Sequence, residues 1–423
     1  MNNVTVLGAG GATVTLSFDS AANAVLARSL AGAVTEGVLS GALVPASSKA
    51  GPPPAVPAGK FGEWVQQGNG ATVLPDNYAA IVSTAKKATI FGTGEDDMTV
   101  LAKGNLTFHS GGGSGTVVAG GGDNRIFLPG KSGDWSVNTG GGDDIINALG
   151  GGNDSVAAGG GRNAIQLGGG SDLVISEGRD RIVLGSGSAT IIASPGGGGD
   201  CEDDDDDDHG GHGGHGGGTS QQVWGGSGSL YFVGGAGPAT VLGGSGSATI
   251  FGGEGTNEFR GGSAGNNLIY AGTGRATVFG GGDGDVIYAE GERKQELNAG
   301  PGATTLFGAL AGGDNIFRAG SGDTEIVGGW GNDRFVAGLG DSTISGGPGK
   351  DVYAFIRGSS GGHDIIWGFD GNDKVKLEGY GGNAVKAALS SQVQVGGGVQ
   401  ITLADSTQVT FMGLSQLTKS DFG

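Results

Sequence analysis

Residues 319–354 read AGSGDTEIV, GGWGNDRFV, AGLGDSTIS and GGPGKDVYA, four nonapeptides in direct succession. The same period gives GGSGSLYFV, GGAGPATVL, GGSGSATIF and GGEGTNEFR over residues 225–260. A short fixed period predicts a stack of like units in which each unit contacts mainly its neighbours. The sequence therefore argues against a globule built around one central core.

Within the nonapeptide, positions one, two and four are mostly glycine, which favours tight turns with positive φ. Position eight is apolar and is occupied by Phe232, Val241, Ile250, Phe259, Ile269, Val278, Ile287, Phe317, Ile326, Phe335, Ile344 and Tyr353. Each nonapeptide thus predicts one turn and one short strand with one face inward. Two nonapeptides close one flattened coil, so turns on the same side of adjacent coils lie 18 residues apart in the sequence.

Composition and charge exclude several classes of partner. Glycine supplies 99 of the 423 residues, and the net charge is -19. Nucleic acid and anionic membranes are not expected as partners, because both require a basic surface. Cations are the natural counterparts. Cys201 is the single cysteine, so no internal disulfide can form, and no apolar run is long enough for a transmembrane helix.

Changes of sequence pattern divide the chain into five segments. They are an N-terminal strand and helix segment with a Pro-rich linker (1–60), a first solenoid array (61–194), an inserted Asp/His/Gly-rich loop (195–220), a second solenoid array (221–355) and a C-terminal flank (356–423). Residues 1–18 alternate as a strand, and Asp19 or Ser20 begins a helix that ends before Pro45. The expected fold is all-β, a parallel β-roll with a small N-terminal α/β segment and a β-rich C-terminal flank.

The inserted loop carries a run of aspartates, Asp203 to Asp208, followed by His209, His212 and His215 with glycine pairs between them. The histidines could bind a transition metal. The favoured interpretation is a solvated, self-repelling loop, because the glycine spacers oppose a preformed site.

The glycine–aspartate nonapeptides resemble the RTX repeats of secreted bacterial proteins, whose pattern is G-G-x-G-x-D-x-U-x. Residues 328–336 and 346–354 fit this pattern at every defined position. The tail, with GHDIIWGFDGNDKVKLEGYG, VQITLADSTQVTFMG and LTKSDF, is similar to the family's C-terminal flank. The resemblance implies a parallel β-roll and an uncleaved C-terminal signal for type I secretion. The N-terminus, MNNVTV, shows no ordinary secretory signal.

Calcium is the cofactor that this resemblance implies, and position six of the nonapeptide supplies the carboxylates. Asn315, Asp333 and Asp351 lie 18 residues apart and are expected to stack on one side of the roll. Thr324 and Ser342 fall on the other side, so one edge should bind metal and the other should be nearly free of it. Calcium prefers carboxylate and carbonyl oxygens, which these turns supply.

Further candidate calcium ligands lie elsewhere in the repeats. They are the pair Asp154 and Asp172, the pair Asn267 and Asp285, and Asp144. The alternative is that these side chains only form turns by hydrogen bonding to the backbone. In the central array position six is Leu230, Ala239, Ala248 and Ala276, so those turns lack a carboxylate.

No enzyme is predicted. G-x-S-x-G occurs at 261–265 and 358–362, but neither stretch has a strand–elbow–helix context, and no H-E-x-x-H motif is present. The favoured function is an extracellular, self-assembling structural protein: a surface-layer, matrix-fibre or filament subunit that forms a homo-oligomer or polymer through its ends. The alternative is a calcium-dependent adhesin, with cell-surface polysaccharide as its partner, or an ice-binding module. The threonines at position seven, such as Thr240 and Thr249, would serve ice binding, but Glu258, Val286 and Arg334 interrupt them.

Overall fold

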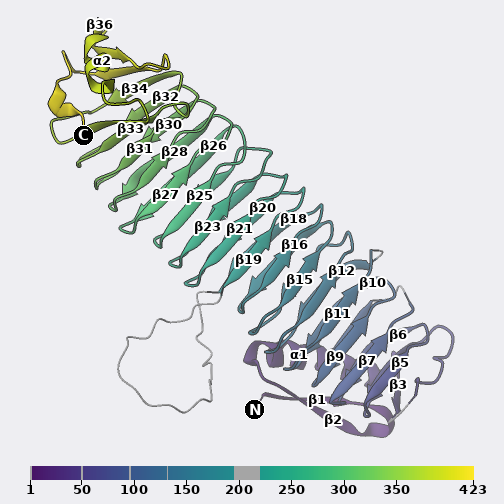
Figure 1. Ribbon diagram of the computed structural model, residues 1–423. Coiled ribbons are helices and arrows are strands. Elements are labelled where there is room, and N and C mark those ends of the chain that lie inside the picture. The colour runs from purple at the N-terminus through teal and green to yellow at the C-terminus, as the bar shows by residue number, and fades with distance from the viewer. Residues whose placement is uncertain (1, 49–50, 95–96, 131, 195–219) are drawn as a thin grey trace, which may run out of the picture. The chain divides into compact units, whose positions relative to one another are not determined.

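The computed structural model describes residues 2–48, 51–94, 97–130, 132–194 and 220–423. The chain divides into a first unit, residues 1–228, and a second unit, residues 229–423. Each unit contains two parallel sheets, here called sheet A and sheet B, and successive strands alternate between them (Figure 1). The predicted parallel β-solenoid of nine-residue repeats is therefore confirmed.

In the first unit both sheets begin well before the clear repeats. Sheet A consists of β3 (Leu43–Ser48), β4 (Phe61–Gln66), β6 (Tyr78–Ser83), β8 (Met98–Ala102), β10 (Gly113–Ala119), β12 (Ser132–Asn138), β14 (Ser155–Ala157), β16 (Ser171–Ser176) and β18 (Ser188–Ala193). Sheet B consists of β5 (Gly70–Val73), β7 (Lys87–Phe91), β9 (Asn105–His109), β11 (Arg125–Leu128), β13 (Ile145–Ala148), β15 (Ala164–Leu167), β17 (Arg181–Val183) and β19 (Gln221–Trp224).

The second unit has eight strands in each sheet. Sheet A consists of β20 (Leu230–Val233), β22 (Ala248–Phe251), β24 (Leu268–Tyr270), β26 (Asp285–Gly291), β28 (Thr304–Ala311), β30 (Thr324–Val327), β32 (Ser342–Ser345) and β34 (His363–Trp367). Sheet B consists of β21 (Ala239–Leu242), β23 (Asn257–Arg260), β25 (Ala276–Phe279), β27 (Gln295–Asn298), β29 (Ile316–Arg318), β31 (Arg334–Val336), β33 (Val352–Ile356) and β35 (Lys374–Glu378).

Position eight forms the core between the two sheets, as the repeat predicts. Phe232, Phe259 and Ile287 are fully buried, and Phe335 and Tyr353 stack with ring centroids 5.2 Å apart. Burying one such side chain contributes roughly 1.5–3 kcal/mol. Each coil repeats this contribution, so a row of apolar residues along the axis replaces a single central core.

Glycine at position two is required by close approach of neighbouring coils. A Cβ atom on Gly320 would lie 1.9 Å from the carbonyl oxygen of Gly300, and one on Gly338 would lie 1.9 Å from that of Gly320. Neither of these glycines has a positive φ, whereas Gly347 at position two and Gly331 at position four do. The left-handed turns expected from the sequence therefore explain only part of the glycine content.

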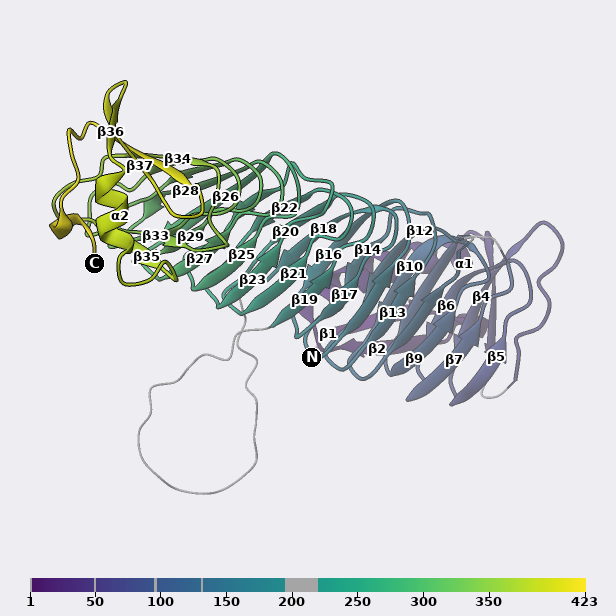
Figure 2. The same ribbon diagram turned by 45° about the horizontal axis from the view of Figure 1, so that its top comes forward.

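The N-terminal segment lies on the outer face of sheet A of the first unit (Figures 1 and 2). Residues 1–18, expected as one strand, form an antiparallel hairpin of β1 (Asn2–Leu7) and β2 (Thr13–Phe18), because Gly10 and Gly11 with positive φ reverse the chain between them. The helix expected after Ser20 is confirmed as α1 (Ala21–Leu39), and the Ser20 hydroxyl accepts a hydrogen bond from the Asn23 N–H (3.3 Å).

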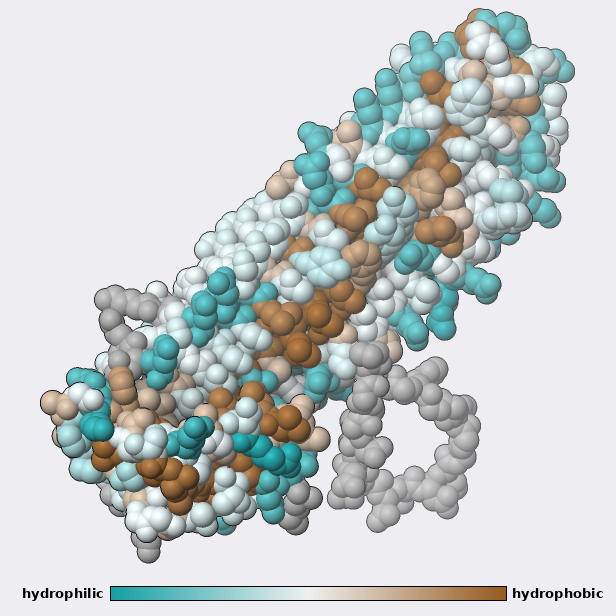
Figure 3. Space-filling view, turned by 180° about the vertical axis from the view of Figure 1, so that it is seen from behind, coloured by the Kyte–Doolittle hydropathy of each residue, from teal (hydrophilic) through white to brown (hydrophobic). Residues whose placement is uncertain are grey.

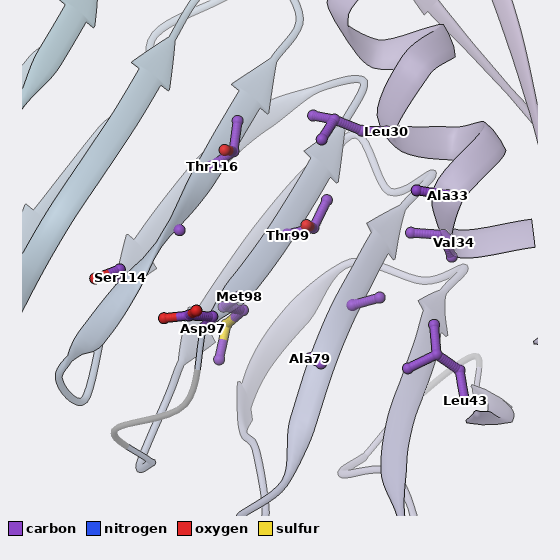
Figure 4. A pocket seen from close by; sticks show the side chains of 12 residues that line it. Leu30, Ala33, Val34, Leu43, Ala79, Asp97, Met98, Thr99, Ser114 and Thr116 are labelled. Atoms are coloured by element: carbon purple, nitrogen blue, oxygen red, sulfur yellow. The ribbon is translucent and has the colours of Figure 1, made fainter. Parts of the chain in front are cut away.

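Apolar packing and two hydrogen bonds hold this segment on the sheet. Val65, Val82, Leu101 and Val118 of sheet A pack with buried residues of α1 and the hairpin. The Asn23 amide donates to the Thr139 carbonyl (2.7 Å), and Asp19 accepts from the Gly141 N–H (2.7 Å). A groove of about 380 Å³ remains along the helix, where side chains of α1 face those of β8 and β10 (Figure 4).

The C-terminal residues cover the last coil of the second unit. They form α2 (Ala384–Ser390), the antiparallel strands β36 (Val393–Val395), β37 (Gly398–Thr402) and β38 (Gln408–Met412), and a 3-10 turn at Lys419–Asp421. β38 pairs with β34 at the end of sheet A, and Phe422 forms a single bridge to Val375 in β35 at the end of sheet B. Both sheet ends are therefore paired.

Among the described residues, neither helix is long and apolar enough to cross a membrane.

Candidate metal centres

Position-six residues form two columns in each unit, one beside the strands of sheet A (column A) and one beside those of sheet B (column B). Parallel pairing with an 18-residue step places these residues above one another. For example, Arg334 pairs with Val352, and these two residues directly follow Asp333 and Asp351 in the chain. Column B of the second unit contains Ala239, Asn257, Ala276, Gln295, Asn315, Asp333, Asp351 and Asp373. The structure therefore stacks Asn315, Asp333 and Asp351 as the sequence predicts.

Hydrogen bonds connect this column from coil to coil. The backbone N–H of each position-six residue donates to the side-chain Oδ1 of the residue one coil later: Asn315 to Asp333 (2.8 Å), Asp333 to Asp351 (2.9 Å) and Asp351 to Asp373 (2.9 Å). These contacts differ from the expected alternative, in which each aspartate bonds its own turn. They occupy one carboxylate oxygen of every aspartate and leave the other for a second partner.

The Oδ2 atoms of the column B aspartates differ in their hydrogen-bond partners from coil to coil. Oδ2 of Asp333 accepts from the Gly329 N–H (3.1 Å), and Oδ2 of Asp373 accepts from the Asp370 N–H (2.9 Å). Oδ2 of Asp351 is buried and has no hydrogen-bond partner. Burial, reinforced by Asp373 and Asp333, raises the pKa of Asp351 to about 7. A cation beside Asp351 would supply the missing partner and favour the charged form.

In the first unit, Asp154 and Asp172 lie in column A. The Trp135 N–H donates to Asp154 Oδ1 (2.9 Å), and the Asp154 N–H donates to Asp172 Oδ1 (2.9 Å). Oδ2 of Asp154 is buried without a partner, and burial raises the pKa of Asp154 to about 6. Asp154 therefore has the same arrangement as Asp351: Oδ1 accepts from the N–H one coil earlier, its own N–H donates to the aspartate one coil later, and Oδ2 is free.

Asp144 lies in column B of the first unit, between two asparagines. Its Oδ1 accepts from the backbone N–H (2.7 Å) and the amide (3.0 Å) of Asn124, and its own N–H donates to Asn163 (3.0 Å). Oδ2 of Asp144 is buried without a partner, and burial raises the pKa of Asp144 to about 6. Asp180, which follows Asn163 in the column, has its Oδ2 hydrogen bonded by the Ser176 hydroxyl (2.6 Å).

Asp285, in column A of the second unit, is fully hydrogen bonded within the protein. Oδ1 accepts from the backbone N–H (2.9 Å) and the amide (2.7 Å) of Asn267. Oδ2 accepts from the N–H groups of Gly281 (2.6 Å) and Gly282 (3.1 Å). Both oxygens of Asp285 therefore have protein partners, as both oxygens of Asp333 do, and its role as a calcium ligand stays a prediction.

The sequence analysis missed Asp364, which lies in column A of the second unit at the place of Ser342 one coil earlier. Both of its carboxylate oxygens are buried without a partner, and burial raises the pKa of Asp364 to about 8. Thr324 and Ser342 do lie on this edge, as expected, but the edge ends in a carboxylate. Part of the signal was present in the sequence, since Gly362 and Asp364 occupy positions four and six of the nonapeptide, although positions one and two are serines.

Position five forms a second, exposed set of hydrogen bonds with the opposite direction. The Asn332 N–H donates back to Asp314 (2.8 Å), and the Lys350 N–H donates back to Asn332 (3.0 Å). Each turn therefore holds its neighbours through position five on one side and position six on the other.

The donor set fits calcium at Asp144, Asp154, Asp351 and Asp364, where buried carboxylate oxygens lack partners. In the described part of the chain, no three His, Cys, Asp or Glu side chains converge in a manner that could hold a metal ion. Calcium at these positions would thus need turn carbonyl oxygens as further ligands, which is ordinary for this cation. The Asp/His loop, apart from Ser220, lies outside the described residues.

The sequence model of the RTX calcium-binding nonapeptide repeat (4 copies) matches residues 149–178, 233–263, 261–292, 311–344, 327–354 and 359–383. These ranges contain Asp154, Asp351 and Asp364, whereas Asp144 lies outside them. They also contain the central array, in which several position-six residues are alanine. No curated protein matches the chain.

Proposed function

We propose that this protein, a member of the RTX β-roll family whose repeats bind Ca²⁺, is an extracellular, self-assembling structural protein stabilised by calcium. The calcium part rests on the buried carboxylate oxygens without partners in the two columns. Above their raised pKa values these groups carry charges that the fold does not compensate. A cation bound only by the folded coils would supply that compensation and contribute directly to folding.

Three sites are proposed from this fit: Asp333 with Asp351, Asp154 with Asp172, and Asp144. Asp364 is added to them. Asn315 supports the first site through its hydrogen bond to Asp333. Asp285, whose two oxygens are hydrogen bonded as those of Asp333 are, stays a predicted ligand outside these three sites. Isothermal titration calorimetry with the full chain should detect calcium binding that Asp351→Asn and Asp154→Asn each reduce. The absence of calcium binding by the wild type would refute this part of the proposal.

The assembly part rests on open strand edges. In the first unit, β3 pairs only with β4 and β5 only with β7 among the described strands, so their outer backbone groups can pair with another copy. Electron microscopy and light scattering in millimolar calcium should show polymers, and chelation should dissolve them. A wild-type protein that stays monomeric in calcium would contradict the structural function and favour the alternative, a calcium-dependent adhesin or ice-binding module.

Export by type I secretion through residues 356–423 is proposed from the resemblance of this tail to the family's flank. Deletion of residues 379–423 should retain the protein in the producing cell, and deletion of residues 2–41 serves as the matched control. The fraction of protein in the medium measures the effect. Normal export of the tail deletion would overturn this assignment.

A further inference from the structure

The outer face of sheet A in the second unit is almost uncharged. Its strands expose Tyr231, Val233, Thr249, Phe251, Leu268, Tyr270, Val286, Tyr288, Thr305, Phe307, Glu325, Val327, Thr343, Ser345, Ile365 and Trp367, all partly or fully exposed. Glu325 is the single charged residue among these sixteen, and Glu290 is a second partly exposed charged residue further along β26. Figure 3 shows the resulting apolar band on this face. A hollow of about 710 Å³, lined by Thr305, Glu325, Thr343 and Ile365 with Asp323 and Asp341 beside them, interrupts the face towards its C-terminal end. An apolar band of this length is uncommon on a protein that remains alone in solution.

Aromatic residues form a column along this face. Phe251 and Tyr270 stack with ring centroids 5.0 Å apart and planes 7° apart, and Tyr270 and Tyr288 stack at 4.5 Å and 6°. Phe307 continues the column with an edge contact to Tyr288. Because the rings cover one another's faces along the column, they present mainly their edges outward. Sugar rings stack on aromatic faces, so this column is poorly suited to bind a polysaccharide.

The outer face of sheet B in the same unit has a different character. Arg318 pairs with Glu296 (2.8 Å) and Arg334 pairs with Glu378 (2.7 Å). Arg260 lies 4.8 Å from the ring centroid of Phe279. Charged side chains therefore solvate sheet B and leave sheet A as the apolar face.

In the first unit, the apolar outer face of sheet A is covered by another part of the chain. There the outward residues Val65, Val82, Leu101 and Val118 are buried beneath α1 and the hairpin. The chain covers that face with its own N-terminal segment. In the second unit Tyr231 remains 42% and Trp367 49% exposed.

We propose that the outer face of sheet A in the second unit binds the same face of a second copy of this chain. With a net charge of -19, two copies repel each other except where the surface is uncharged. The eight strands span about 38 Å by about 13 Å, so the pair would bury on the order of 1,000 Å² in total. This area is at the lower limit of specific interfaces, and we expect weak pairing in isolation.

Periodicity supports a second copy as the occupant. A face with rows spaced by the strand distance of about 4.8 Å is matched best by a surface with the same spacing, as in packed β-sheets. A two-fold axis brings the same patch of both copies together. This pairing deepens the proposed self-assembly by naming a lateral contact, which strengthens when many copies lie along a polymer.

Sedimentation equilibrium of the full chain up to about 1 mM, with calcium, tests the pairing. The variant Phe251→Glu/Tyr288→Glu should raise the dissociation constant of the pair roughly tenfold or more, because it buries unpaired carboxylates in the contact. The control Leu242→Glu/Asn298→Glu adds the same two charges at position nine of sheet B and should pair like the wild type. A milder variant, Tyr270→Thr/Tyr288→Thr, should also weaken pairing, and circular dichroism confirms that each variant keeps its β structure.

A wild type that stays monomeric at this concentration would overturn the proposal, as would a face variant that pairs like the control. A monomeric wild type that binds insoluble polysaccharide through this face would assign the face to an adhesin instead. A wild type that forms pairs but no polymers in calcium would refute the proposed polymer and leave the pairing intact. The failure of one proposal can therefore be told apart from the failure of the other.

Discussion

Two parts of the second unit have the same backbone but different position-six residues. In column B, residues 315–373 provide Asn315, Asp333, Asp351 and Asp373, whereas residues 239–276 provide Ala239, Asn257 and Ala276. Both parts keep the residue-by-residue parallel register. The carboxylates are therefore not needed to shape the coil.

Apolar packing and neutral hydrogen bonds stabilise the central coils. Phe232 and Phe259 are in contact in the core (6.2 Å between ring centroids), and the Ala239 N–H donates to Asn257 (3.2 Å). In the C-terminal coils the same bonds end on carboxylates, which brings buried negative charge into the fold. The difference predicts that calcium binding by the C-terminal carboxylates adds to a coil that the packing already specifies.

Removal of calcium should produce the largest difference in local stability between the C-terminal coils and the central coils. On chelation at pH 8, amide hydrogen exchange in residues 315–375 should accelerate by about 100-fold or more, because uncompensated buried charges open those coils. Residues 230–280 should change far less. Equal acceleration in both parts would remove the distinction drawn between them.

Replacing one carboxylate should stabilise the calcium-free protein and reduce the stabilisation that calcium provides. Asp351→Asn keeps the Oδ1 acceptor for the Asp333 N–H and removes the charge of the buried Oδ2. Without calcium at pH 8 the variant should gain about 1–3 kcal/mol in free energy of unfolding, whereas its gain from calcium should shrink. Asp285→Asn is the matched control, since both oxygens of Asp285 are hydrogen bonded. Denaturant titrations with and without calcium measure both changes, and a destabilised Asp351→Asn in chelator would contradict the argument.

The pH dependence follows from the raised pKa values. The pKa of Asp351 is raised from 3.8 to about 7 and that of Asp364 to about 8, both chiefly by burial. The folded chain thus holds these protons more tightly than the unfolded chain, and calcium-free stability falls as pH rises from about 4 to about 8. Calcium should flatten this slope.

Glu63 provides the control for this experiment. It is buried in β4 without partners, and burial raises the pKa of Glu63 to about 7 as well, although it lies outside both columns. Thermal melts in the Glu63→Gln background therefore isolate the contribution of the columns. A calcium-free melting temperature that rises between pH 5 and pH 8 in that background would show that the buried aspartates do not dominate.

The smallest expected effect lies in the central coils. Asn257→Ala removes the acceptor for the Ala239 N–H and two weak donations to Gly253 and Ala271. It should cost about 0.5–1.5 kcal/mol and leave the calcium response unchanged. A calcium response altered by this substitution would show that the central coils also take part in binding.

The solenoid and its core could be predicted because each nonapeptide repeats the same turn and the same inward residue. The stacking of Asn315, Asp333 and Asp351 followed from their spacing alone. Whether the Oδ2 atom of each aspartate has a hydrogen-bond partner could not be predicted from the spacing. It depends on whether a turn N–H, such as that of Gly329 or Gly281, reaches this oxygen. Asp364 was missed because 22 residues, instead of 18, separate it from Ser342.

The placement of the N-terminal segment was also beyond the sequence. The helix after Ser20 could be recognised from its cap and spacing, but its resting place depends on apolar residues of four different strands. Single residues such as Val65 or Leu101 do not differ in the sequence from other outward residues of the repeats. Only the folded sheet shows that they form one surface.

The alternation of successive nonapeptides between the two sheets limits how the gene can change length. Unequal recombination that inserted or removed a single repeat would transfer every later strand to the opposite sheet. The aromatic column would then be split between two faces, and the paired arginines and glutamates of sheet B would be scattered in the same way. Only gains or losses of an even number of repeats preserve the faces, so the number of repeats in this array is constrained in parity even where it is free in length.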